Sequence, residues 1–160
     1  MRRGHCRHSE EGSRQVTAVL IREALLADAP ALARLNTVAM GYDYPEDRTA
    51  EKLAVILADS RAKILVAELA GRVAGYLHLE DYEVLYVNSM KNIMGIAVAP
   101  DCRRMGIGRQ LLAAGEAWAR EQGAQAIRLV SGESRTDAHA FYRALGFAGN
   151  KMQLNLKKSL

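Results

Sequence analysis

The chain has 160 residues, of which 49% are hydrophobic and 25% are charged, as expected for one soluble globular domain. These values exclude a disordered chain, a collagen and a disulfide-stapled scaffold. The longest uncharged run, residues 92–100, is far shorter than the roughly 20 residues of a membrane helix, so we expect no membrane partner.

The net charge of +4 is unevenly distributed. Residues 41–83 hold nine acids and five bases, whereas residues 84–160 hold five acids and eleven bases. A basic half fits nucleic acid, a polyphosphate ligand or a solvated surface without a partner. The sequence carries no RNA-binding signature and no zinc-finger spacing, so nucleic acid is the weakest of these three interpretations.

Residues 1–16 are polar and lack the apolar run of a secretory signal, so we expect a flexible N-terminal extension before a single domain at residues 17–160. The two cysteines, Cys6 and Cys102, form no CxxC motif. We therefore expect no structural zinc and a reducing, cytoplasmic location.

Apolar periodicity and turn residues predict ten elements. In chain order they are a strand at 17–22, a helix at 29–40, a helix capped by Thr49, strands at 64–69, 73–79 and 92–98, a helix at 106–122, a strand at 126–130, a helix at 137–145 and a strand at 152–156. Asp28 is the expected N-cap of the first helix. The order β-α-α-β-β-β-α-β-α-β predicts a mixed α/β domain.

The segment from residue 96 to 112 is the most informative. An apolar strand runs into a basic loop, then two glycines, then an amphipathic helix. The first N–H groups of a helix lack internal partners and attract anions. Gly106 and Gly108 would let phosphate oxygens approach the backbone, and Arg109 adds a cation. The pattern predicts a pyrophosphate site but matches neither a Walker A loop nor a dinucleotide fingerprint.

Two motifs carry a family resemblance. Arg103-x-x-Gly106-x-Gly108 resembles the [RQ]xxGx[GA] signature of the GNAT superfamily of N-acetyltransferases. Residues 138–147, AHAFYRALGF, look like the AxxFYxxxGF segment of the same family. The resemblance covers residues 17–158 and implies a mixed, mostly antiparallel sheet flanked by helices, with acetyl-CoA as acetyl donor.

The resemblance also implies which residues hold the coenzyme. Its pyrophosphate would lie on the loop and helix start, at Arg103, Arg104, Met105, Gly106, Ile107, Gly108 and Arg109. The pantetheine arm would lie along Ile96, Ala97 and Val98, mainly through the backbone of the first and last, with Gly95 at a strand distortion. Ser134 and His139 either contact the coenzyme or lie in solvent.

Tyr142 is the expected general acid, because a phenol can protonate the departing thiolate. The base is harder to assign, since the Glu that some family members carry on the strand before the loop is absent from residues 91–96. Tyr76, His78, Glu80 and Tyr82 alternate and would share one strand face. Glu80 or His78 is then the candidate base, although an ordinary polar face explains the same pattern.

We expect direct attack of an amine on the thioester in a ternary complex, with the Val98 amide polarising the carbonyl and no metal involved. Cys102 lies too near the pyrophosphate site to be an acyl nucleophile. The acidic stretch favours a cationic amine, either a small molecule or a peptide. A homodimer through residues 152–156 is expected. The alternatives are a non-catalytic acyl-CoA sensor and a nucleic-acid binder.

Overall fold

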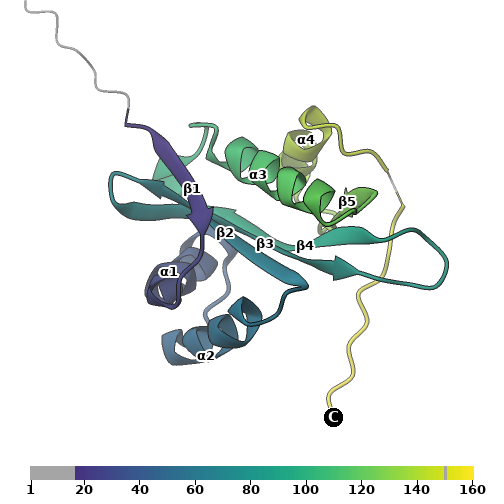
Figure 1. Ribbon diagram of the computed structural model, residues 1–160, viewed down its shortest axis with the longest axis horizontal. Coiled ribbons are helices and arrows are strands. Elements are labelled where there is room, and N and C mark those ends of the chain that lie inside the picture. Colours follow the sequence, from purple (N-terminus) through teal and green to yellow (C-terminus); the bar gives the residue numbers. More distant parts are fainter. Residues whose placement is uncertain (1–16, 150) are drawn as a thin grey trace, which may run out of the picture.

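The computed structural model describes residues 17–149 and 151–160, so the predicted extension at 1–16 lies outside the described residues. A five-stranded sheet separates two helical layers, with α1 and α2 on one face and α3 and α4 on the other (Figure 1). The elements are β1 (Val19–Glu23), α1 (Ala29–Met40), α2 (Glu46–Leu57), β2 (Ala62–Leu69), β3 (Arg72–Tyr82), β4 (Met90–Val98), α3 (Ile107–Glu121), β5 (Ala126–Arg128) and α4 (Thr136–Ala144). Short 3-10 turns at Leu26–Asp28 and Pro100–Cys102 precede α1 and α3.

The strands are ordered β1-β2-β3-β4-β5 in space. The first three pairings are antiparallel and the β4–β5 pairing is parallel, which confirms the predicted mixed, mostly antiparallel sheet. The β4–β5 register is short: Met90–Asn92 lies against Ala126–Arg128. Beyond Asn92 the two strands no longer pair, so the second half of β4 borders an opening in the sheet.

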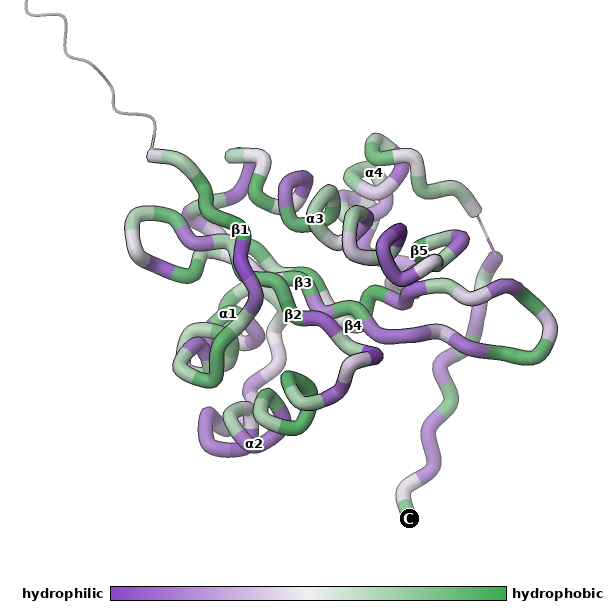
Figure 2. The backbone as a smooth tube through the Cα atoms, viewed as in Figure 1, coloured by the Kyte–Doolittle hydropathy of each residue, from purple (hydrophilic) through white to green (hydrophobic). Residues whose placement is uncertain are grey.

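The core lies between the sheet and its two helical layers, and Figure 2 shows hydrophobic residues along the middle of β2 and β3. Leu77 and Leu79 of β3 are fully buried under α3. A Cβ on Gly115 would lie 2.7 Å from Leu77 Cδ2 and 2.8 Å from Leu79 Cδ1. A glycine is therefore needed where the helix crosses β3, because any side chain there would push α3 off the sheet.

The predicted cap of α2 is wrong, and Asp28 occupies the predicted N-cap position of α1 without capping it through its side chain. α2 begins at Glu46, and Thr49 lies inside it with its hydroxyl donating to the Pro45 carbonyl at 3.0 Å. Asp28 makes no side-chain cap to α1, because an arginine engages its carboxylate instead. In both places another partner engages the polar side chain: the Pro45 carbonyl accepts from Thr49, and Arg22 donates to Asp28.

The predicted last strand, residues 152–156, is also not formed. These residues are extended without strand pairing, and Met152, Leu154 and Leu156 are 68%, 86% and 85% exposed. The alternation of apolar side chains shows which face a strand would bury, but a strand also needs a neighbouring edge. Within one chain this segment leaves the sheet, so the observed order ends at α4 (Figure 1).

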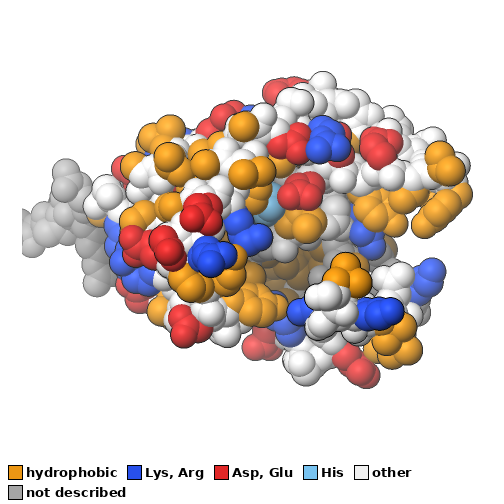
Figure 3. Space-filling view, turned by 90° about the horizontal axis from the view of Figure 1, so that it is seen from below, with side chains coloured by type: hydrophobic (Ala, Val, Ile, Leu, Met, Phe, Trp, Pro, Cys, Tyr) orange, Lys and Arg blue, Asp and Glu red, His pale blue; other side chains and the backbone are white. Residues whose placement is uncertain are grey.

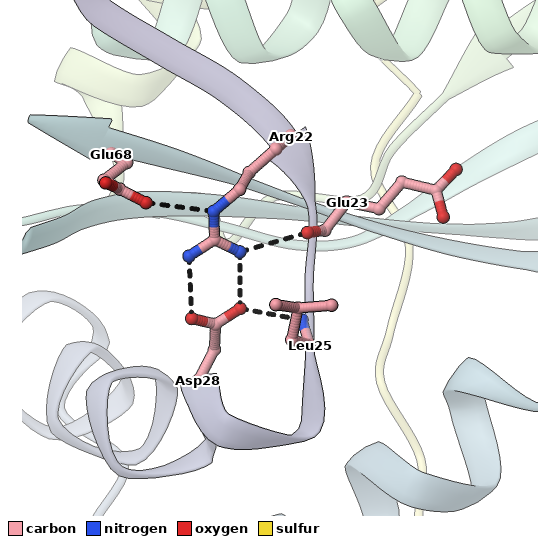
Figure 4. A network of polar contacts seen from close by, with 5 residues as sticks. All are labelled: Arg22, Glu23, Leu25, Asp28 and Glu68. Atoms are coloured by element: carbon pink, nitrogen blue, oxygen red, sulfur yellow. Dashed lines mark hydrogen bonds and ion pairs between the residues drawn. The ribbon is translucent and has the colours of Figure 1, made fainter. Parts of the chain in front are cut away.

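Arg22 joins β1, β2 and the start of α1 in one polar network (Figure 4). Its guanidinium donates to both carboxylate oxygens of Asp28 at 2.8 and 2.9 Å, to Glu68 Oε2 at 3.0 Å and to the Glu23 carbonyl at 3.1 Å. The Leu25 amide donates to Asp28 Oδ2 at 2.7 Å. Hydrogen bonding to Arg22 holds the pKa of Asp28 below its ordinary value, against an opposing effect of burial.

We expect Asp28→Asn to lower the free energy of unfolding at pH 7 by about 1.5–3 kcal/mol, the range for hydrogen bonds to charged groups. Because the pKa of Asp28 is lower in the folded state, its contribution is present above the unfolded aspartate pKa of about 3.9. The contribution is lost as pH falls through the folded pKa, so variant and wild type should converge in acid. Denaturant-induced unfolding of the wild type and of Asp28→Asn, measured at several pH values, gives the two free energies of unfolding that test this prediction.

Asp59→Asn is the matched control, because Asp59 pairs with an exposed Arg61 two residues away. An exposed local ion pair adds little to stability. If Asp28→Asn and Asp59→Asn lower the free energy of unfolding at pH 7 by the same amount, the network does not stabilise the junction of β1, β2 and α1.

Candidate active site

The loop between β4 and α3 presents free backbone N–H groups to solvent. Gly106 is the N-cap residue of α3, and its backbone lies in the left-handed region with φ 77°. The backbone of the exposed Arg104 lies in the same region, with φ 63°. Gln110 N donates to Gly106 O at 3.0 Å as α3 begins. The N–H groups of Ile107, Gly108 and Arg109, in the first turn, therefore have no helical acceptor. With exposed arginines on both sides, the loop has the donor set of a pyrophosphate site.

The two loop glycines have different structural roles. A Cβ on Gly106 would meet nothing within 4 Å, so its glycine is explained by the positive φ. A Cβ on Gly108 would lie 3.0 Å from Phe141 Cζ, so its glycine lets α4 pack over the start of α3. Sequence reasoning assigned both to phosphate access. The structure adds a second role for Gly108, which brings the two family motifs into contact.

β4 is distorted beside Gly95, as predicted. The register with β3 shifts there: His78 faces Gly95 and Leu79 faces Ile93, so Met94 is an extra residue. Such a bulge bends β4 next to the opening between β4 and β5.

Strand geometry decides which β4 backbone groups face that opening. Ala99 N donates to Ala74 O at 2.8 Å, toward β3. Because backbone direction alternates along a strand, Ile96 and Val98 point their N–H and C=O groups at the unpaired edge. Ala97 points its groups at β3 and buries its side chain, so the prediction that Ala97 takes part in coenzyme binding does not fit the structure.

The bulge is lined on the α1 side by Tyr76 and by two residues that the sequence analysis did not single out, Asn36 and Met40. A Cβ on Gly95 would lie 3.4 Å from the Tyr76 hydroxyl and 3.8 Å from Met40 Cε. The Tyr76 hydroxyl donates to Asn36 Oδ1 at 2.6 Å, and burial raises the pKa of Tyr76 to about 12. Asn36 lies one turn from both Leu32 and Met40, and a polar residue on that apolar helix face was the available signal.

His78 and Glu80 lie together on the face that carries Tyr76. His78 Nε2 is 3.0 Å from Glu80 Oε1, with side chains 15% and 39% exposed respectively. The contact is not aligned as a hydrogen bond, and the buried Nε2 atom has no hydrogen-bond partner among the residues described. Burial lowers the pKa of His78, and Glu80 partly opposes this. A neutral imidazole at neutral pH can therefore accept a proton.

Glu80 lies next to a group of polar and aromatic side chains at the end of the same face. It faces Asn92 across the β3–β4 ladder, and Arg128 of β5 donates to Asn92 Oδ1 at 2.7 Å. The Arg128 guanidinium also lies 4.2 Å from the Tyr82 ring centroid. Figure 3 views the molecule from the α1 and α2 side, which is hollowed and carries both acidic and basic side chains. Asp81 points to the opposite face, as strand alternation requires, and pairs with Lys91.

Tyr142 lies half-buried on α4 between two aromatic rings. Its ring centroid is 5.4 Å from Phe141 and 5.6 Å from Phe147, both edge-to-face. Burial raises the pKa of Tyr142, and the positive charge of Arg135 at the start of α4 opposes this. Arg135 was not singled out from the sequence. Ser134 is exposed and His139 half-buried, each near the same helix start.

Cys102 lies buried between β4 and the loop, and Arg72 Nη2 contacts its Sγ at 3.0 Å. Burial raises the pKa of this thiol, which keeps it protonated and weakens it as a nucleophile. Among the described residues no group of three or more His, Cys, Asp or Glu side chains could hold a metal ion. No helix within residues 17–149 and 151–160 is long and apolar enough to cross a membrane.

Comparison with known proteins identifies the family. The profile of the acetyltransferase (GNAT) family matches residues 29–147. An aminoglycoside N(6')-acetyltransferase type 1 of Stenotrophomonas maltophilia is 34% identical over 137 residues, which cover 82% of this chain and 87% of that protein. An N-alpha-acetyltransferase of Sulfurisphaera tokodaii is 30% identical over 137 residues, covering 79% of this chain and 78% of that protein.

A solved structure shows the same fold at lower identity. An aminoglycoside N-acetyltransferase in complex with coenzyme A superposes with a TM-score of 0.81 at 19% identity, covering 92% of this chain and 99% of that one. The α/β layers, the mixed sheet and the two motifs agree with these matches. The chain therefore belongs to the acetyltransferase (GNAT) family, acyltransferases whose donor is acetyl-CoA.

Proposed function

We propose that the protein transfers an acetyl group from acetyl-CoA to a primary amine by direct attack, with donor and acceptor bound together. The observation that carries this proposal is the pairing of His78 with Glu80, whose Nε2 and Oε1 atoms lie 3.0 Å apart opposite the β4 bulge, with the two side chains 15% and 39% exposed. A proton acceptor at that position suits an enzyme better than a non-catalytic sensor, which needs the loop but no base.

On the donor side, the free N–H groups at the start of α3, with Arg103, Arg104 and Arg109, would hold the pyrophosphate. The unpaired backbone of Ile96 and Val98 would hold the pantetheine arm by strand-like pairing. Bound acetyl-CoA supplies the activated acetyl group. The Val98 N–H, one of the groups that face the opening, would donate to the developing negative charge on the carbonyl oxygen.

On the acceptor side, His78 would take a proton from the incoming ammonium through the part of its ring that stays exposed, because Nε2 itself is buried against Glu80, and Glu80 would stabilise the resulting imidazolium. Tyr142 would give its proton to the leaving sulfur, and the second proton that the attacking nitrogen loses as the amide forms would restore the Tyr142 hydroxyl. Because the pKa of Tyr142 is raised by burial, its hydroxyl stays protonated at neutral pH and is ready to donate.

The acceptor that we propose first is a small molecule with several amino groups, of the aminoglycoside type. The α1–α2 connection and α2 carry Asp43, Glu46, Asp47 and Glu51 on the side where Glu80 lies. These carboxylates would attract a polycation. The name of the Stenotrophomonas maltophilia relative supports this class, while that of the Sulfurisphaera tokodaii relative keeps a peptide N-terminus as the alternative. Two cysteines without a CxxC motif favour the cytoplasm as the location.

The test has two parts. Acetyl-CoA at a hundred times its dissociation constant should raise the free energy of unfolding by about 2.7 kcal/mol, whereas ATP and NAD should not. For a chain of this size the melting temperature should then rise by roughly 5–10 °C. Release of the coenzyme A thiol is then followed with aminoglycosides, a polyamine and a peptide bearing a free N-terminus. Initial rates against both substrates should give intersecting lines, as a ternary complex requires, and not the parallel lines of an acyl-enzyme.

The two parts separate the alternatives. A melting shift without thiol release for any amine would make the chain an acyl-CoA sensor. Absence of a melting shift would overturn the assignment of the loop as a coenzyme site.

A further inference from the structure

The side-chain amide of Asn36, on α1, is bound at one end and free at the other. Its Oδ1 atom accepts from the Tyr76 hydroxyl at 2.6 Å. Its Nδ2 atom donates to no acceptor among the residues that the structure describes. The side chain is only half-buried, and Nδ2 is not one of the enclosed polar atoms without a partner. A molecule bound on this side of the sheet can therefore reach a free amide donor.

The bond to Tyr76 decides which way this amide faces. Burial raises the pKa of Tyr76 to about 12, so its hydroxyl stays protonated at neutral pH and donates its one proton to Asn36 Oδ1. Met40 Sδ, at 3.6 Å from the same hydroxyl, is a weaker acceptor. The backbone is held as well, because the Asn36 carbonyl accepts from Tyr42 N at 2.9 Å. With Oδ1 fixed at Tyr76, Nδ2 is held in one direction, away from that hydroxyl.

The pair lies beside the group that we propose as the base. Tyr76 and His78 share one face of β3, and alternate residues on such a face stand about 7 Å apart. The Tyr76 hydroxyl ends 3.4 Å from where a Cβ on Gly95 would be, and Gly95 faces His78 across the ladder. Each hydrogen bond to a bound molecule spans about 3 Å. An amine held at His78 would therefore place its neighbouring atoms within reach of Asn36 Nδ2.

We propose that Asn36 Nδ2 donates a hydrogen bond to an ether or hydroxyl oxygen of the acceptor, on the carbon next to the one that bears the reacting amine. Tyr76 is then a positioning residue that aims the amide. This inference rests on the proposed function and narrows its acceptor to amines that carry such an oxygen. An amide N–H can donate to an oxygen but not to an ammonium group, so the same position would disfavour an acceptor with a second ammonium there.

The test compares two amines that differ at one position of a ring. In 2-aminomethyltetrahydropyran the ring oxygen is bonded to the carbon that carries the aminomethyl group, and aminomethylcyclohexane has a methylene in place of that oxygen. Initial rates of thiol release at saturating acetyl-CoA give kcat and KM for each amine. The specificity ratio is kcat/KM for the ether divided by kcat/KM for the carbocycle. Its change between wild type and variant does not depend on the different basicities of the two amines.

Replacing Asn36 by Leu should lower the specificity ratio by about tenfold, the worth of one hydrogen bond, mainly through KM for the ether. The constants for the carbocycle should stay within about twofold, since that amine makes no such bond. Leu suits the apolar face of α1 between Leu32 and Met40, so the fold should persist. Thr37→Val is the matched control, because Thr37 is exposed on the same helix, and its ratio should equal that of the wild type.

Tyr76→Phe tests the positioning role and does not depend on the folding of Asn36→Leu. It keeps the amide but releases Oδ1, so the specificity ratio should fall by about threefold, less than when the donor itself is removed. Added to Asn36→Leu, it should lower the ratio no further, because Tyr76 acts through Asn36. The melting shift with acetyl-CoA should be alike in all variants, since the pyrophosphate loop is elsewhere.

The outcomes separate this inference from the function on which it rests. An unchanged ratio in Asn36→Leu, or equal losses with both amines, would overturn the inference and leave acetyl transfer intact. A further fall of the ratio in the double variant would overturn the positioning role of Tyr76. Absence of thiol release by the wild type with every amine would instead overturn the proposed function, and this inference with it.

Discussion

Replacing Tyr142 by Phe should lower kcat by about 10²-fold, the lower end of the range for a general acid. The change removes a single oxygen and keeps the aromatic packing of Tyr142 between Phe141 and Phe147. The position of α4 over Gly108 should therefore persist, and KM for acetyl-CoA should stay within about twofold because only the proton donor is lost. Initial rates of thiol release, measured with an amine that the wild type acetylates, give both constants.

The pH profile tests the same assignment by a different route. Tyr142 acts as an acid, so activity that depends on it should fall as pH rises through its pKa. Burial raises that pKa, which places this basic limb above pH 10, and the limb should vanish in Tyr142→Phe. Tyr86→Phe is the control, because Tyr86 is 79% exposed between β3 and β4. Equal kcat for Tyr142→Phe and wild type would remove Tyr142 from the reaction.

Replacing His78 by Gln should lower kcat/KM by about 10²-fold, because the proton acceptor is lost while an amide of similar length fills the space. In the wild type, activity should fall as pH drops and His78 becomes protonated. Since burial lowers the pKa of His78, the midpoint of this acid limb should lie below the ordinary value of 6.5. Measurement of kcat/KM from about pH 5 to 9 with one amine shows the limb, and His78→Gln should lack it.

Glu80→Gln separates the base from its neighbour. Glu80 raises the pKa of His78, so the loss of its charge should lower that pKa further and move the acid limb to lower pH. If Glu80 itself were the base, Glu80→Gln would instead abolish the limb and His78→Gln would keep it. An unchanged acetyl-CoA melting shift in both variants shows that the donor site is intact.

The donor side of the site was largely predictable from the sequence. The two glycines after an apolar strand, the arginines beside them and the helix start are local features, and local features set backbone conformation. The exposed loop arginines and the free first-turn amides of α3 agree with that prediction. The reason for Gly108 was not predictable, because its neighbour Phe141 is 33 residues away in the chain.

The acceptor side was predictable only in part. Alternation correctly placed Tyr76, His78 and Glu80 on one face of β3. It could not reveal that His78 lies opposite Gly95, that its Nε2 atom is buried without a hydrogen bond, or that Asn36 of α1 reaches Tyr76. Each of these depends on strand register or on the packing of a helix against the sheet.

The sequence by itself determined the family, the α/β class, most element boundaries and the glycine-rich helix start that is the candidate anion site, because periodicity, turn residues and helix ends depend on neighbours within a few positions. Tertiary structure alone decided which partners distant groups find: Arg22 for Asp28, Phe141 for Gly108 and Gly95 for His78. It also decided that residues 152–156 form no strand within one chain. A pattern of side chains specifies the face that a segment would bury, whereas pairing requires an edge that only the assembled sheet can provide.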